Sequence, residues 1–116
     1  MDSNYYFNHN ELVKKTLVYI HSQGLGRFWP NNTGKVRSEA GRWIQFGFKG
    51  SPDIIGFNKS GRFVGLEIKT GKAIQGREQK AFERVSLDHG CVYLVVRGEE
   101  DFESIVGVIR GQEDVK

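Results

Sequence analysis

The sequence is poor in cysteine and proline and has no long apolar run. Its single cysteine, Cys91, excludes an internal disulfide and a zinc cluster built from several cysteines. No stretch reaches the roughly 20 apolar residues of a membrane-spanning helix. The first ten residues, MDSNYYFNHN, lack the basic start and apolar core of a signal peptide. We therefore expect no membrane partner and a reducing, cytoplasmic location.

The charge of the chain is unevenly distributed. The net charge is +3, but residues 99–116 hold six acidic and two basic residues, and the preceding residues hold fifteen basic and eight acidic ones. A basic body with an acidic end suits a polyanion-binding surface, although the same charges could serve solubility alone. At 116 residues, the chain has the length of one small domain, residues 1–116.

Hydrophobic spacing and turn residues predict alternating helices and strands. We expect a long loop or an irregular extended arm with many donors over residues 25–41, and a short bent strand or a bulged loop around 43–48. We also expect helices at residues 9–23 and 99–110, and between them a helix of about three turns that lies after Gly71 and ends at Gly90. The other expected strands are at 53–57, 62–70 and 91–96. This order predicts an α/β protein with a mixed β-sheet flanked by helices.

The strands at 53–57 and 62–70 bring three charges into apolar surroundings. If Lys59–Gly61 form a three-residue hairpin loop, opposite residues sum to 120 and Asp53 faces Glu67. Lys69 then extends the same face by one pleat. Gly65, on that face, would leave room for another backbone to approach.

Two carboxylates directly opposite each other repel and favour a bound cation. Mg²⁺ or Mn²⁺ suits oxygen ligands, and the Ile68 backbone carbonyl could add one. Lys69 would orient an attacking water or stabilise the charge that develops on a phosphate. The alternative is that Glu67 and Lys69 form the solvated face of an edge strand and Asp53 caps a turn.

Four segments together resemble a known nuclease group. They are Gly50-Ser51-Pro52-Asp53, the run GRFVGLEIKTGK from Gly61 to Lys72, REQKAF from Arg77 to Phe82, and GCVYLVVR from Gly90 to Arg97. The combination resembles the PD-(D/E)xK nuclease superfamily and, within it, the stand-alone phage and bacterial form of the virus-type replication-repair nuclease (VRR-NUC) domain. The resemblance covers about residues 10–97.

This resemblance implies a restriction-endonuclease-like core that hydrolyses DNA phosphodiesters with a divalent metal. It implies that Asp53 and Glu67 bind the metal, that Lys69 is catalytic and that Glu11 is a further metal-binding acid. Gln79 would support the metal-site water or position DNA. It also implies a homodimer that cuts branched DNA such as a four-way junction. Glu11 could instead stabilise its helix through Lys15, and Gln79 could be a surface residue.

Basic, amide and hydroxyl side chains near these segments are candidates for phosphate contacts, which position DNA without reading its sequence. They are Asn32, Thr33, Lys35, Arg37, Arg42, Lys49, Lys72 and Arg77. A solvated loop is the alternative for residues 31–37. The three histidines lack the spacing of a metal triad, and we assign none of them a catalytic role.

The sequence therefore predicts a metal-dependent, structure-selective DNA endonuclease of the Holliday-junction resolvase type. Two alternatives remain. The same site could serve a flap or single-strand nuclease of phage replication or repair, or the chain could be a non-catalytic DNA-binding module.

Overall fold

The computed structural model describes residues 7–111, which form ten helical and strand elements. In chain order they are α1 (His9–Ser22), β1 (Gly26–Pro30), β2 (Gly34–Arg37), β3 (Trp43–Phe46), β4 (Ile54–Asn58), β5 (Phe63–Ile68), α2 (Arg77–Asp88), β6 (Val92–Val96), the 3₁₀ turn η2 (Glu99–Asp101) and α3 (Phe102–Arg110).

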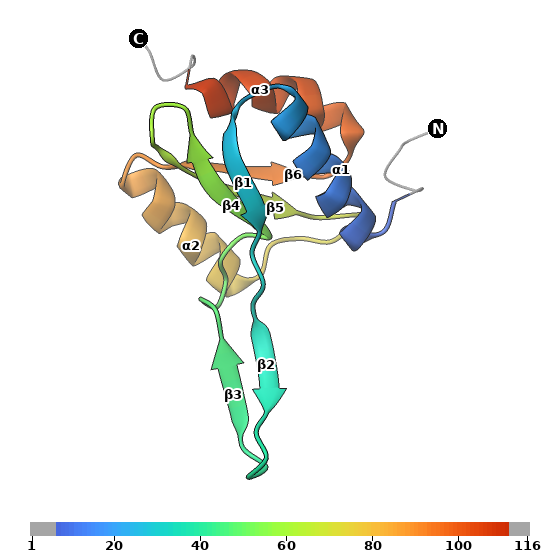
Figure 1. The fold of residues 1–116 in the computed structure, drawn as a ribbon, viewed down its shortest axis with the longest axis vertical. Coiled ribbons are helices and arrows are strands. Elements are labelled where there is room, and N and C mark those ends of the chain that lie inside the picture. Colours follow the sequence, from blue (N-terminus) through green and yellow to red (C-terminus); the bar gives the residue numbers. More distant parts are fainter. Residues whose placement is uncertain (1–6, 112–116) are drawn as a thin grey trace.

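A four-stranded mixed sheet forms the centre of the fold, in the order β1-β4-β5-β6 (Figure 1). β4 pairs antiparallel with β1 and with β5, while β5 and β6 are parallel. β2 and β3 form a separate two-stranded sheet. The expected α/β class, with a mixed sheet flanked by helices, is confirmed.

Helix α1 begins where the sequence supplies a cap. The Asn8 side chain accepts a hydrogen bond from the Glu11 N–H at 2.8 Å, and Glu11 Oε1 accepts one from the Asn8 N–H at 2.9 Å. This reciprocal pair is a capping box, which satisfies two backbone donors at the helix start. Leu12 and Ile20 are fully buried, so one face of the helix packs into the core.

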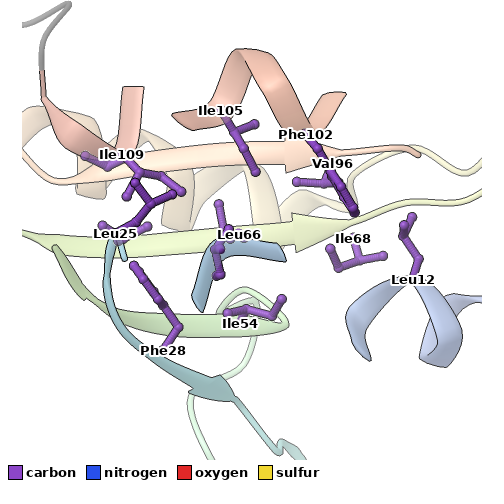
Figure 2. Packing of buried hydrophobic residues seen from close by; sticks show 13 residues of the cluster. Leu12, Leu25, Phe28, Ile54, Leu66, Ile68, Val96, Phe102, Ile105 and Ile109 are labelled. Carbon is purple, nitrogen blue, oxygen red and sulfur yellow. The ribbon is translucent and has the colours of Figure 1, made fainter. Parts of the chain in front are cut away.

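The core lies between the sheet and helices α1 and α3, as Figure 2 shows. β4 and β5 contribute Ile54, Val64, Leu66 and Ile68, all fully buried. The opposite face of the sheet is covered by α2, whose Phe82 ring lies near Phe63 of β5 and Tyr93 of β6. β6 therefore has helices on both of its faces, which explains its uninterrupted apolar sequence.

The β4–β5 hairpin has the predicted register. Ile54 lies opposite Leu66 and Phe57 opposite Phe63, so paired residues sum to 120. The Asn58 N–H donates to the Arg62 carbonyl, and Gly61 has a left-handed φ of +83°. A three-residue loop needs this conformation, which glycine adopts without a steric penalty.

The expectation of a long loop or an irregular extended arm over residues 25–41 is wrong about the irregularity, because this segment contains two regular strands, β1 and β2. β1 is an edge strand in which only Phe28 is buried, and β2 has no buried residue. Because these strands bury so little, their sequences do not alternate clearly between apolar and polar residues. β1 is held by its pairing with β4, a contact distant in sequence. The short strand expected around 43–48 is confirmed as β3 (Trp43–Phe46).

β2, β3 and the turn between them, residues 34–46, project from the sheet as a ribbon that we call the arm (Figure 1). The arm is anchored beside the start of β4. The Asn31 N–H donates to the Asp53 carbonyl at 2.8 Å, and Asn31 Nδ2 donates to Ser51 Oγ and to the Pro52 carbonyl. The arm therefore arises directly next to one of the candidate catalytic acids.

The last expected helix, 99–110, is divided into η2 and α3. The Arg97 N–H donates to the Asp101 carboxylate at 2.7 Å across η2. α3 ends at Gly111, which has a left-handed φ of +82°. Phe102, Ile105 and Ile109 turn toward the sheet and complete the core (Figure 2).

Candidate metal and catalytic site

The hairpin brings the candidate acids to one end of the sheet. Asp53 directly precedes β4, and Glu67 is near the end of the neighbouring β5. The Ile68 N–H donates to Asp53 Oδ2 at 2.7 Å, which ties the start of one strand to the end of the other. Ile68 thus contributes its N–H to this arrangement, while the role predicted for its carbonyl stays a prediction.

Glu67 is almost completely buried, with 1% of its surface exposed. Its Oε2 accepts a hydrogen bond from Gln79 Nε2 at 2.7 Å and lies 3.6 Å from Lys69 Nζ. In residues 7–111, its Oε1 is the buried side-chain oxygen that has no hydrogen-bond partner. A buried polar atom without a partner is costly, so this oxygen needs a proton or a cation.

The environment of Glu67 disfavours its negative charge. Burial is the largest cause and the neighbouring Asp53 carboxylate the second, and together they raise the pKa of Glu67 to about 8. Lys69 acts in the opposite direction but does not cancel them. A divalent cation beside the two carboxylates would supply the missing positive charge.

Gln79 connects α2 to this site. It is in the first turn of α2, and its Oε1 accepts a hydrogen bond from the Gly76 N–H at 2.7 Å. Its Nε2 is then directed to Glu67 Oε2. The amide is therefore fixed at both ends and holds one oxygen of the buried carboxylate in place, which a free surface glutamine would not do.

His9 belongs to the site although the sequence analysis gave it no role. Its Nε2 lies 3.3 Å from Asp53 Oδ2, because α1 begins at this end of the sheet. Glu11, two residues later, has one carboxylate oxygen in the capping box with Asn8. The contact between His9 and Asp53 depends on the tertiary fold. In the sequence, the position of His9 in the first turn of α1 is the one signal that could have indicated it.

We expected Gly65 to leave room for another backbone, and in the structure this room is taken by the side chain of Pro52. A Cβ at this position would lie 2.6 Å from Cγ of Pro52, far inside normal contact distance. The ring of Pro52 therefore occupies the space above Gly65. This contact fixes the residue directly before Asp53 against the middle of the sheet.

The candidate DNA-contacting residues fall into two groups. Lys35, Arg37 and Arg42 lie on the arm and Asn32 and Thr33 precede it, while Lys49, Lys72 and Arg77 lie near the start of α2. Two of these cations already have partners. The Arg37 guanidinium lies over the Trp43 ring at 5.4 Å, and Lys49 Nζ is 3.6 Å from Glu78 Oε2. The Glu78 backbone N–H and Lys49 lower the pKa of Glu78.

No group of three or more His, Cys, Asp or Glu side chains in the described part of the chain is arranged to hold a metal ion. Asp53 and Glu67 are a pair, and Mg²⁺ is commonly held by one or two carboxylates together with water and substrate oxygens.

None of the helices within residues 7–111 is long and apolar enough to span a membrane.

Comparisons with known proteins do not identify a family. No protein-family model matches this sequence, and no curated protein is similar enough to match it.

Proposed function

We propose that this protein is a divalent-metal-dependent, structure-selective DNA endonuclease of the VRR-NUC type with a restriction-endonuclease-like core. The observation that carries the proposal is the Glu67 carboxylate. It is buried beside Asp53, one of its oxygens has no partner, and Lys69 Nζ lies 3.6 Å from the other. A purely structural site has little reason to retain this costly arrangement.

The position of the acids supports this proposal. β5, which carries Glu67 and ends one residue before Lys69, is inside the mixed sheet, and helices α1 and α2 both begin at the end where Asp53 and Glu67 meet. Helix N-termini favour anions such as phosphate. The same end therefore combines acids for a cation with a positive potential for a phosphodiester.

The residues fit Mg²⁺ or Mn²⁺, with Asp53 and Glu67 as the ligands and the Ile68 carbonyl and Glu11 as further predicted ones. When bound, such an ion polarises a phosphoryl oxygen and lowers the pKa of a coordinated water. Lys69 orients the attacking water by hydrogen bonding and stabilises negative charge on the phosphate as the bond to the leaving oxygen breaks. Gln79 keeps Glu67 in position, and His9 does the same for Asp53.

The proposed substrate is branched DNA, in particular a four-way junction, and the proposed assembly is a homodimer. A two-fold symmetric dimer has two sites, which suits the two equivalent strands of a junction. The arm carries Lys35 and Arg37 outward from Asp53, so it can contact the duplex next to the cleaved phosphate.

Cleavage of a labelled four-way junction tests this function, beside a flap and a duplex of the same sequence, in Mg²⁺, Mn²⁺ and EDTA. We expect paired symmetric nicks in the junction with either metal, none in EDTA and none with Asp53→Ala. Cleavage of the flap alone would indicate that the protein is a flap nuclease. DNA binding with no cleavage in either metal would exclude the catalytic proposal.

A further inference from the structure

The uncovered part of the sheet, beyond α2, carries an exposed pair of aromatic rings. Trp29 on β1 is 45% exposed and Phe57 on β4 is 46% exposed, and their rings meet edge to face with centroids 6.2 Å apart. In the β1–β4 register, Trp29 lies opposite Ile55 and Arg27 opposite Phe57. We call Trp29 and Phe57, together with their neighbours Arg27 and Ile55, the aromatic face.

The aromatic face lies on the same side of β4 as Asp53. Side chains alternate along a strand, so Asp53, Ile55 and Phe57 share one side, and Phe57 is roughly 14 Å from Asp53 along the chain. β1 is an edge strand of the sheet, so the aromatic face extends to its border (Figure 1). A ligand that leaves the acids along β4 would meet these rings.

A basic pocket adjoins the aromatic face at the far end of β4. A cavity of about 410 Å³ is lined by Arg27, Phe57 and Lys59, with the glycines Gly24, Gly26 and Gly61. A second cavity, of about 320 Å³, is lined by Lys59 and by Arg110 of α3. Among the described residues that line the two cavities there is no Asp or Glu.

Exposed aromatic rings beside cations match the two parts of a nucleotide. Bases stack on aromatic side chains irrespective of their identity, and the backbone phosphates are attracted to lysine and arginine. The glycines line the cavity without side chains, which leaves room for a phosphate beside Arg27 and Lys59. Paired bases inside a duplex do not offer their faces in this way, so the ligand must be unpaired.

We propose that the aromatic face and the basic pocket bind an unpaired DNA strand, with bases on Trp29 and Phe57 and phosphates at Arg27 and Lys59. The nuclease would then prefer branched substrates with a single-stranded tail next to the cleaved phosphate. The binding itself follows from these residues, whereas its coupling to cleavage rests on the proposed function.

The test is fluorescence anisotropy of a labelled single-stranded oligonucleotide in EDTA, where no cleavage takes place. Trp29→Ala should weaken binding about ten-fold through lost stacking, and Trp29→Phe should restore most of it. Val18→Ala is the control, because Val18 is an apolar residue that is 70% exposed and lies on α1, outside both the aromatic face and the arm. Its affinity should stay within about two-fold of the wild type. Thermal melting of each variant confirms that it is folded.

A direct readout uses Trp43→Phe, in which Trp29 is the single tryptophan. Adding the oligonucleotide should quench its fluorescence, and Lys59→Glu in the same background should weaken the quenching. The proposal is overturned if Trp29→Ala binds like the wild type, or if Val18→Ala weakens binding equally. It is also overturned if Trp29→Ala turns a dimer into a monomer by sedimentation, because the aromatic face would then be a contact between two copies.

Because this binding is measured without metal, its outcome is independent of the nuclease proposal. Tail binding that persists in a protein that cleaves no DNA would reject the proposed function and retain the inference. Metal-dependent cleavage without tail binding would do the reverse.

Discussion

The end of the sheet around Glu67 and the arm have opposite physical characters. Glu67 is almost fully buried, and its carboxylate is contacted by Lys69 and Gln79. On the arm, Val36, Trp43 and Ile44 are exposed, and its two strands form a sheet of their own. A buried, cross-linked site holds reacting groups in a fixed geometry, whereas an exposed ribbon offers surface to a partner. In the proposed nuclease, the buried site would carry out the chemistry and the exposed arm would contact the substrate.

The largest effect should follow from Lys69→Ala. The lysine is the cation next to Glu67, so its loss removes charge stabilisation at the phosphate, and cleavage should fall about a thousand-fold. DNA binding in EDTA should change little, because the proposed DNA contacts lie on the arm and on the aromatic face and do not include Lys69. Single-turnover cleavage and anisotropy on the same junction measure both. A loss of binding as large as the loss of cleavage would mean that the site and the arm are not separate in function.

Glu67→Gln should stabilise the metal-free protein at high pH. The pKa of Glu67 is about 8 in the folded protein and 4.5 in the unfolded chain. Between these two pH values the folded state therefore binds more protons than the unfolded state. The free energy of unfolding of the wild type should therefore fall as pH rises through this window, by at most roughly 5 kcal/mol. The amide variant resembles the protonated acid and should lose this dependence.

Urea unfolding in EDTA at pH 5 and pH 9 measures this effect. Glu83→Gln, a matched change on α2, should unfold with the pH dependence of the wild type. If wild type and Glu67→Gln were equally stable at pH 9, the unfavourable burial of the Glu67 charge would be contradicted.

Gln79→Ala compared with Gln45→Ala contrasts the two regions with the same substitution. Gln79 fixes Glu67 Oε2, so its removal should lower cleavage about 10-fold to 100-fold, as for other residues that orient a metal ligand. Gln45 is exposed on the arm, and its removal should change cleavage less than about three-fold. The metal concentration for half-maximal cleavage should rise only for Gln79→Ala. Equal effects of the two changes would argue against the role of Gln79.

Charge reversal on the arm should give the smallest effect on catalysis and a clear effect on binding. Lys35→Glu with Arg37→Glu removes two of the proposed phosphate contacts, so junction affinity should fall about ten-fold and its salt dependence should weaken. Lys14→Glu with Lys15→Glu, on α1, changes charge equally and is the control. Cleavage at saturating protein should stay near the wild-type rate. An unchanged affinity would show that DNA does not contact the arm.

The local sequence predicted the β4–β5 hairpin of the candidate site better than it predicted the strands of β1 and the arm. The register of Asp53 against Glu67 depends on one short loop, and Gly61 indicates that loop in the sequence. β1 and β2 were missed because they bury almost nothing and β1 is held by distant pairing. The contacts of Gln79 and His9 depend on where two helices begin relative to the sheet, which no local pattern specifies.

The most direct test of the central claim is a Mg²⁺ titration of single-turnover junction cleavage by the wild type and by Glu67→Gln. We predict that cleavage by the wild type rises with Mg²⁺, saturates and is abolished by EDTA, and that the variant, though folded and DNA-bound, loses it. Equal cleavage by the two proteins, or cleavage that persists in EDTA, would contradict a metal site built on Asp53 and Glu67.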